Sequence, residues 1–286
     1  MQPQGPSRTA IMTALHRAAH LLLDGDPKIL EDRFARAFAG YESDDDLLSA
    51  LDKTALADFP RMRTLFCLRS RYAEDELVRA CSHGLGQYAI LGAGLDSFAY
   101  RRPAVLSTVD VFEIDHPASQ EWKRARVEQL AIARPAWLHY VPIDFEHATL
   151  AHGLAASSID LTRPTFFSWL GTTQYLTTDT VLQTLGTVAA VAAPGSELVM
   201  QVIVPPATLA PEEAVLVSTL AARAASVGEP WLSYFEPTDL ARDLRKAGFE
   251  RVTHFDQKQA TVRYLQHRAD GLTLPTYFHM ITAQLG

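Results

Sequence analysis

Between residues 87 and 203 the sequence alternates short apolar runs with helical patterns, and this alternation strongly limits the folds available to the chain. The apolar runs cover residues 87–91, 110–115, 138–144, 165–169 and 197–203. The helical patterns between them cover residues 117–133, 147–156 and 178–193. Strands that are apolar along most of their length and separated by helices are typical of a parallel sheet covered on both faces. The sequence therefore predicts an α/β fold.

The flanking regions differ from this alternating part. In the first eighty residues, Ile11, Leu15, Ala18 and Leu22 recur at spacings of four, three and four, which places them on one helix face. Further helices are predicted over 44–51 and 61–80. After residue 204 we expect a helix-rich insertion at 205–236, a helix at 238–247 and two late strands at 249–255 and 277–284. A single domain is predicted, with the segments 1–80, 81–204, 205–236 and 237–286.

Composition limits which binding partners and which cellular compartment we expect for the chain. The formal net charge is −7 and no Lys/Arg-rich run occurs, which argues against nucleic acid and anionic membrane as partners. Two cysteines do not make a disulfide framework, so we expect a reduced, cytoplasmic setting. No metal site is predicted, because His16 and His20 have no carboxylate motif nearby. The sequence does not specify an oligomeric state.

A glycine turn follows the first apolar run, in the order Ile90-Leu-Gly-Ala-Gly-Leu-Asp96. Glycines here let the backbone turn sharply at the edge where open α/β sheets bind ligands. Ser97 stands where a dinucleotide fingerprint has its third glycine, and Asp96 is a poor neighbour for pyrophosphate. S-adenosylmethionine carries a sulfonium and an ammonium, so Gly92, Ala93, Gly94 and Asp96 favour it. A nicotinamide-dependent oxidoreductase and a simple tight turn remain as alternatives.

Acidic residues end the next two predicted strands. Glu113 and Asp115 share one strand face about twenty residues beyond the glycines, the spacing at which an acid can bind ribose hydroxyls. We favour Asp115, with His116 beside the cofactor; a helix N-cap is the alternative for Asp115. Asp144 could reach the exocyclic amine of adenine, with Phe145 beside the ring. A cap for Asp144 and core packing for Phe145 are the structural alternatives.

Four motifs together resemble the leucine carboxyl methyltransferase-like family, in its bacterial branch of class I S-adenosylmethionine-dependent O-methyltransferases. They are Gly92-Ala-Gly-Leu-Asp-Ser97, Phe112-Glu-Ile-Asp-His-Pro117, Val141-Pro-Ile-Asp-Phe145 and Gly171-Thr-Thr-Gln-Tyr-Leu-Thr177. The resemblance implies a Rossmann-like sheet of seven strands with an antiparallel last strand. It also implies a cofactor-binding core at 81–204, under a lid made of residues 1–80 and 205–236.

The resemblance also implies two statements about single residues. Arg71 would form a salt bridge with the carboxylate of the methyl donor, because a guanidinium presents paired donors suited to that group; a surface arginine is the alternative. Many family members carry Glu at the position of Leu170, where it helps to hold the donor. Leu170 cannot do so, which keeps a non-catalytic nucleoside-binding protein open as an alternative.

The methyl acceptor is expected beside the segment that follows the fourth strand. Trp169, Thr172, Gln174 and Tyr175 are the candidates for lining its pocket, although each could instead be structural. No residue stands out as a base, with His116 a weak candidate. A carboxylate is already ionised at neutral pH, whereas a phenol needs a base. The sequence therefore predicts methylation of a carboxylate, or of a hydroxyl, on a small-molecule acceptor.

Overall fold

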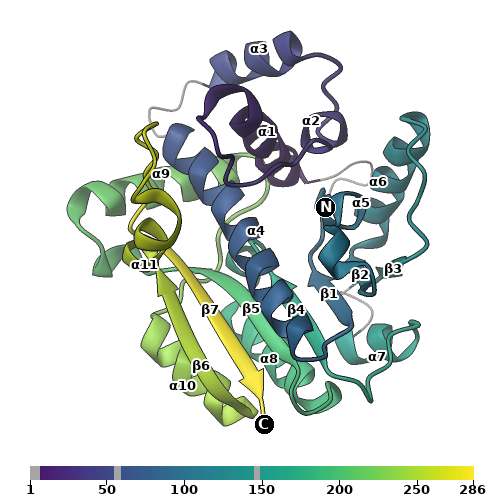
Figure 1. Cartoon of the computed structure of the whole chain (residues 1–286). Coiled ribbons are helices and arrows are strands. Elements are labelled where there is room, and N and C mark those ends of the chain that lie inside the picture. Colours follow the sequence, from purple (N-terminus) through teal and green to yellow (C-terminus); the bar gives the residue numbers. More distant parts are fainter. Residues whose placement is uncertain (1–6, 55–58, 145–148) are drawn as a thin grey trace.

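The computed structural model describes residues 7–54, 59–144 and 149–286. They form a seven-stranded sheet with the order β3-β2-β1-β4-β5-β7-β6 (Figure 1). The strands are β1 (Gln87–Leu91), β2 (Asp110–Asp115), β3 (Leu138–Pro142), β4 (Thr165–Trp169), β5 (Glu197–Ile203), β6 (Phe249–Asp256) and β7 (Phe278–Leu285). Neighbours among β1 to β5 pair in parallel, whereas β7 runs antiparallel to β5 and β6. The prediction of a mostly parallel sheet with an antiparallel last strand is confirmed.

Helices cover both faces and one end of this sheet. They are α1 (Arg8–Leu23), α2 (Ala35–Phe38), α3 (Asp44–Thr54), α4 (Phe59–Ser82), α5 (Phe98–Arg101), α6 (Pro117–Gln129), α7 (Leu150–Ala155), α8 (Thr178–Val191), α9 (Pro211–Ser226), α10 (Pro237–Ala247) and α11 (Gln257–Ala260). Figure 1 shows α1, α2 and α3 grouped above one end of the sheet, with α4 across its front and α8 and α10 behind. No helix in the described ranges combines the length and the apolar character needed to cross a bilayer.

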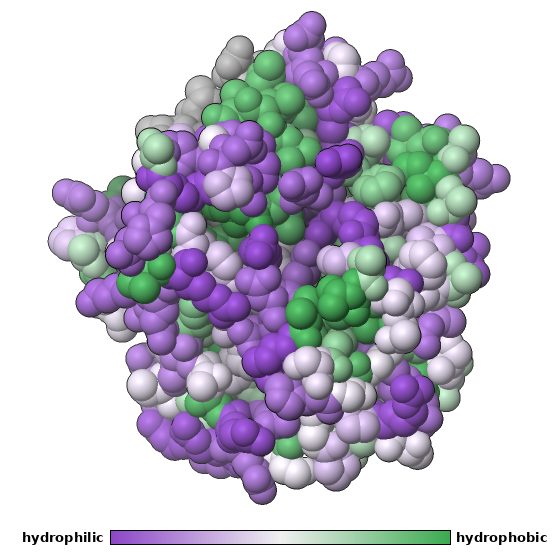
Figure 2. Space-filling model, in the orientation of Figure 1, coloured by the Kyte–Doolittle hydropathy of each residue, from purple (hydrophilic) through white to green (hydrophobic). Residues whose placement is uncertain are grey.

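The two apolar cores follow from the alternation of side chains along each strand. Phe166 of β4 lies in a buried cluster with Leu68 of α4, whereas the next residue, Phe167, packs with Val181 and Leu185 of α8. Every central strand contributes to both clusters, which explains the near-continuous apolar runs in the sequence. Figure 2 shows hydrophilic residues over much of the front face, with a hydrophobic area among the N-terminal helices.

Some boundaries differ from the predicted ones. β3 ends at Pro142, where the following Ile143 N–H still donates to the Asp115 carbonyl at 2.9 Å, and Asp144 lies on the loop after the strand. The helix α7 begins at Leu150, capped by Thr149, whose hydroxyl accepts a hydrogen bond from the His152 N–H at 3.2 Å. The predicted insertion is helical mainly over α9, and its last ten residues form neither helix nor strand.

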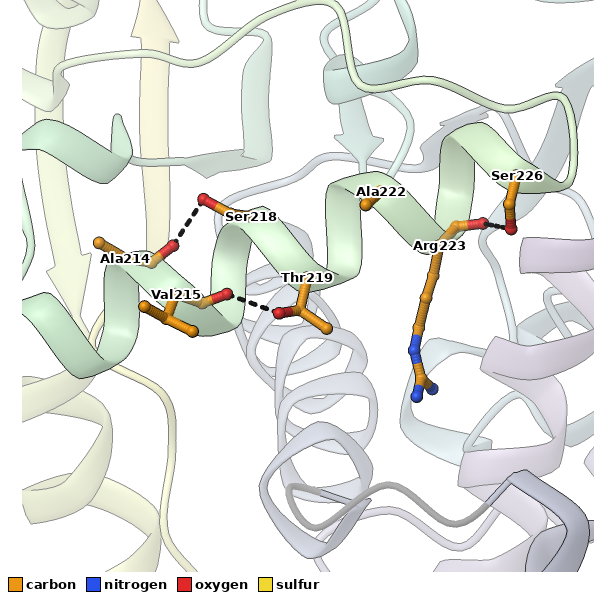
Figure 3. Close-up of a pocket in the computed structure, with 7 residues that line it drawn as sticks. All are labelled: Ala214, Val215, Ser218, Thr219, Ala222, Arg223 and Ser226. Carbon is orange, nitrogen blue, oxygen red and sulfur yellow. Dashed lines mark hydrogen bonds between the residues drawn. The ribbon is translucent and has the colours of Figure 1, made fainter.

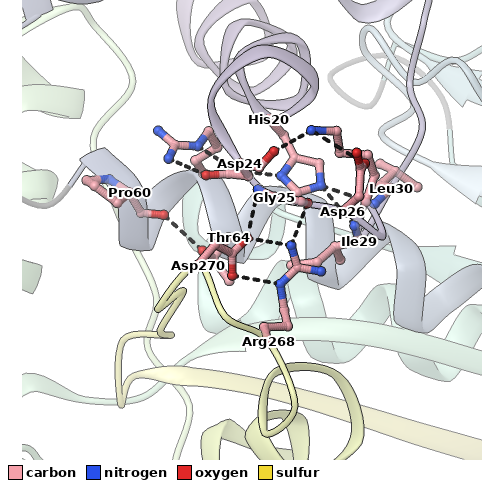
Figure 4. Close-up of polar contacts among 12 residues, drawn as sticks. His20, Asp24, Gly25, Asp26, Ile29, Leu30, Pro60, Thr64, Arg268 and Asp270 are labelled. Atoms are coloured by element: carbon pink, nitrogen blue, oxygen red, sulfur yellow. Dashed lines mark hydrogen bonds and ion pairs between the residues drawn. The ribbon is translucent and has the colours of Figure 1, made fainter.

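The C-terminal end of α1 is held by a buried polar network (Figure 4). His20 Nδ1 lies 2.6 Å from the carboxylate of Asp24, which also binds Arg63 of α4. The next residue along, Gly25, donates its N–H to Asp270 at 2.9 Å and accepts from Arg268 at 2.8 Å. The network therefore joins the N-terminal helices to α4 and to the segment that precedes β7.

Candidate active site

The glycine turn after β1 is bound to the end of β2. Gly92 and Gly94 have φ angles of +68° and +50°, in the left-handed region that favours glycine. The Gly92 N–H donates to the carbonyl of Ile114 at 2.8 Å, and the Gly94 N–H donates to the Asp115 carboxylate. The first two predicted strand ends therefore meet as the sequence analysis expected.

The third strand end joins them through His116. Asp115 Oδ1 accepts a hydrogen bond from the His116 N–H at 2.6 Å, and burial raises the pKa of Asp115 despite this bond. His116 caps α6, where its Nδ1 accepts from the Ala118 N–H at 3.2 Å. Its other nitrogen, Nε2, lies 3.8 Å from the Asp144 carboxylate. The helix N-cap considered as an alternative role for Asp115 is thus supplied to α6 by His116. Phe145, the other residue expected beside adenine, falls outside the described residues.

At the end of β4, Gly171 is packed against the guanidinium of Arg69 from α4. Gly171 has a φ of +70°, and a Cβ added to it would lie 2.2 Å from Arg69 Nη1. The same nitrogen donates to Gln201 Oε1 at 3.0 Å. Burial, followed by repulsion from Arg17, lowers the pKa of Arg69 to about 10, so the side chain stays charged at neutral pH.

Arg69 is a buried cation without an acidic ion-pair partner among the described residues. Only 8% of the residue is exposed, and no carboxylate of the described residues lies within ion-pair distance of it. A guanidinium has five N–H donors, and an uncompensated buried charge is unfavourable. The arrangement suits an anionic ligand group.

The four candidates for the acceptor pocket have different surroundings. Thr172 packs on the first glycine turn, so that a Cβ added to Gly92 would lie 2.6 Å from its methyl carbon. Its hydroxyl is buried and has no hydrogen-bond partner among the described residues. Gln174 is buried and donates to the carbonyl of Gly171 at 3.1 Å, whereas Tyr175 is half-buried in the short turn η2 (Thr173–Tyr175).

Trp169 differs from the other three candidates in its surroundings. It is 4% exposed and belongs to the apolar core shared with α8, because strand alternation puts it on the same face as Phe167. Its role in the acceptor pocket stays a prediction.

Arg71 forms an ion pair on the surface of α4. Its side chain is 45% exposed and its Nε donates to Asp75 Oδ1 at 2.8 Å, four residues along α4. Its binding of the methyl donor stays a prediction, beside the alternative of a surface arginine. Leu170 is half-buried and packs against the core beneath α4.

One candidate residue of this region, Arg69, was missed from sequence. Arg69 lies four residues after Leu65 and four before Ala73, both buried, so the apolar stripe of the helix could have marked it as an inward-facing cation. Glu113, which was considered for ribose, is fully buried and bound to Lys123 of α6 at 2.6 Å. It is therefore not available to a ligand.

A separate hollow of about 640 Å³ runs along α9 (Figure 3). Its described lining residues are Ala214, Val215, Ser218, Thr219, Ala222, Arg223 and Ser226. None of them belongs to a strand end, so this hollow is distinct from the region around Gly92 and Gly171.

Comparison with known proteins agrees with the arrangement of the strand ends. A family model described as leucine carboxyl methyltransferase matches residues 10–189. The Bacillus subtilis protein YktD, which bears the name of an S-adenosyl-L-methionine-dependent methyltransferase, is 30% identical over 215 residues, or 75% of this chain and 70% of YktD. A Mycobacterium tuberculosis protein of the same description is 31% identical over 220 residues, or 73% of this chain and 69% of that protein.

Solved structures show the same fold. One from Thermobifida fusca, named as a methyltransferase, matches with a TM-score of 0.60 at 19% identity and covers 98% of this chain and 95% of its own. The strand ends joined at Gly94 and the buried Arg69, which has no acidic partner among the described residues, would suit a ligand that carries a nucleoside at one end and a carboxylate at the other. The chain belongs to the leucine carboxyl methyltransferase family and is an S-adenosylmethionine-dependent methyltransferase.

Proposed function

We propose that this enzyme transfers the methyl group to an oxygen of a small molecule, and that this oxygen belongs to a carboxylate. The donor supplies an electrophilic methyl group on a sulfonium. The chain has to hold the donor, align the acceptor oxygen with the methyl carbon and exclude water. The family itself is described by a carboxyl acceptor, which supports the proposal.

The donor would be held by groups from three strand ends and from α4. Asp115 would accept hydrogen bonds from ribose, in addition to the Gly94 N–H that it already binds, and Asp144 would accept from the adenine amine. Arg69 rather than Arg71 would bind the carboxylate, because it is buried beside Gly171 and lacks an acidic partner among the described residues. Asp96, at the same turn, favours a cationic ligand by its charge.

The structural observation that supports a carboxylate acceptor is the hydrogen bonding of His116. Because its Nδ1 accepts a hydrogen bond from the Ala118 N–H, the neutral ring carries its proton on Nε2. A ring nitrogen that carries a proton cannot remove one from an acceptor. Among the other described imidazoles, His16 of α1 is buried near Arg69, and burial, followed by repulsion from Arg63 and Arg69, lowers its pKa to about 3, which makes it a poor base. His254 and His279 lie on β6 and β7, beyond β4 and β5. An acceptor that is already ionised needs no base.

A labelling experiment tests this proposal. The enzyme is incubated with methyl-labelled S-adenosylmethionine and a panel of small carboxylic acids, with phenols in parallel, and the products are treated with mild alkali. Alkali hydrolyses a methyl ester and releases the label as volatile methanol, whereas a methyl ether keeps it. We expect label transfer that is lost in alkali.

The Asp115→Ala variant serves as the control that transfer uses this site, and it should transfer little label. Recovery of the label only in products that survive alkali would contradict a carboxylate acceptor, and would favour a hydroxyl instead.

A further inference from the structure

The backbone of the glycine turn is held in place by side chains from outside it. The carbonyl of Leu95 accepts a hydrogen bond from Arg17 Nη2 of α1 at 2.7 Å. The carbonyl of Asp96 accepts one from Lys123 of α6, and the Gly94 N–H donates to Asp115. Three consecutive residues of the turn are thus tied to three different elements.

Arg17 is buried and paired, so its position is fixed. Its Nε donates to Asp32 Oδ2 at 2.8 Å, and the two side chains are 6% and 0% exposed. Burial would raise the pKa of Asp32, but attraction to Arg17 and Arg101 outweighs this and lowers it, so the pair is ionised at neutral pH. The forked guanidinium can bind the carboxylate and the Leu95 carbonyl at the same time.

The helix that carries Arg17 also contacts the turn directly. A Cβ added to Gly94 would lie 3.5 Å from the Cβ of Ala10, and Leu95 packs in a small apolar cluster with Ala14. The carbonyl held by Arg17 belongs to the same rigid peptide group as the Asp96 N–H, which donates to Ala93 at 2.8 Å. Holding that carbonyl therefore fixes the direction of the whole turn.

We propose that Arg17 is a positioning residue of the donor site: through the Leu95 carbonyl it holds the glycine turn in the shape that receives the methyl donor. The proposal rests on the proposed seating of the donor at Gly92–Gly94. It makes the N-terminal helix a part of the donor site, although Arg17 itself touches only the protein.

The chain offers a matched control in Arg63. Its ion pair with Asp24 is equally buried, with side chains 7% and 2% exposed, and it also joins N-terminal helices to each other. Each acid has a second cationic or ionisable neighbour, Arg101 at 3.9 Å from Asp32 and His20 at 2.6 Å from Asp24. Only the Arg17 pair reaches the glycine turn.

The test compares Arg17→Met with Arg63→Met by calorimetric titration with S-adenosylhomocysteine, alongside urea unfolding. We expect similar losses of stability in both variants. The dissociation constant should rise about tenfold or more in Arg17→Met, as loss of a hydrogen bond from a charged donor predicts, and less than threefold in Arg63→Met. Equal binding by the two variants would overturn the inference. Failure of the unmodified enzyme to bind would instead overturn the proposed donor site.

Two further measurements keep the inference testable if Arg17→Met does not fold. Arg17→Lys retains the charge beside Asp32 but lacks the fork, so it should fold normally and bind S-adenosylhomocysteine more weakly than the unmodified enzyme. Hydrogen exchange of the ligand-free protein over residues 91–98 should be faster in Arg17→Lys than in Arg63→Met. Unchanged exchange and unchanged binding in Arg17→Lys would contradict the positioning role.

Discussion

At the scale of single residues, two arginines of α4 show how position on a helix decides what a side chain can do. Arg71 is half-exposed and forms an ion pair with Asp75, an arrangement that contributes little to stability. Arg69, two residues earlier, is buried against Gly171 and Gln201. The same side-chain chemistry is therefore a surface feature at one position and a candidate ligand-binding group at the other.

Substituting each arginine by glutamine separates these roles. In Arg69→Gln we expect the dissociation constant of S-adenosylhomocysteine to rise about 10- to 100-fold, because a charged hydrogen bond to its carboxylate is lost. In Arg71→Gln we expect a change below about twofold, since an exposed ion pair contributes little. Calorimetric titration of both variants measures this, and the reverse order would support the role that the family resemblance implied for Arg71.

The glycine at position 92 is required by both backbone angle and space. Gly92→Ala should lower the free energy of unfolding by about 2 to 5 kcal/mol, because it strains a positive φ and pushes a Cβ against Thr172. Gly186→Ala in the interior of α8 is the control. A Cβ there meets nothing within 4 Å, so alanine should raise stability by about 0.5–1 kcal/mol. Urea unfolding measures both, and equal effects would refute the argument.

At the scale of elements, the ion pair of Glu113 and Lys123 joins β2 to α6. Burial raises the pKa of Glu113 from 4.5 to about 7 even beside this cation. The pKa of Glu113 is higher in the folded chain than in the unfolded chain, so binding of a proton to Glu113 stabilises the fold. This stabilisation is fully present below about pH 4.5. It is lost as the pH rises through about 7.

Lys123→Met should therefore lower the free energy of unfolding more at high pH than at low pH. At pH 8 the variant buries a carboxylate without its cation, and we expect a loss of about 3–5 kcal/mol in unfolding free energy. At pH 5 Glu113 takes up a proton and the loss should be smaller. Lys246→Met, which removes an exposed pair with Asp243, should change stability by less than about 0.5 kcal/mol at either pH. Equal losses for Lys123→Met at both pH values would contradict the assignment.

Elements were predicted well from sequence because their signals are local. The apolar runs located β1 to β5, and the helical pattern over 178–193 located α8, which Thr177 caps by accepting from the Thr180 N–H at 3.2 Å. The strand-end acids could be predicted because they adjoin those runs. The contacts of Arg17 and Arg69 could not, since each side chain contacts a turn more than seventy residues away; periodicity marks Arg69 only as inward-facing, not the group that it meets.

At the scale of the whole molecule, the two parts of the expected lid are joined to each other. The carboxylate of Glu229, in the loop after α9, accepts hydrogen bonds from the backbone N–H groups of Arg8 and Thr9 at 3.0 and 3.3 Å. These are orphan donors in the first turn of α1, where a negative charge is favourable. The insertion thereby holds the start of the helix that carries Arg17.

Glu229→Gln should loosen this contact without disturbing the sheet. We expect faster hydrogen exchange in the first turn of α1 and a loss of about 0.5–1 kcal/mol in unfolding free energy, because the charge at the helix N-terminus is removed. Glu31→Gln, which alters an exposed pair with Arg33, is the control and should change neither measurement. Unchanged exchange in α1 would show that the two segments are not energetically coupled.

The crowding of Gly92 by Thr172 and of Gly171 by Arg69 has a consequence for how the enzyme can diversify. Two adjoining strand ends share a fixed volume, so a methyl group gained on one side must be given up on the other. Sequence drift at these positions is then tightly confined: a smaller residue at 172 would make room for a Cβ at 92, but the φ of +68° would still favour glycine there. Because residue 172 also begins the segment proposed to face the acceptor, selection for a new acceptor through this position would reshape the turn beneath the donor as well.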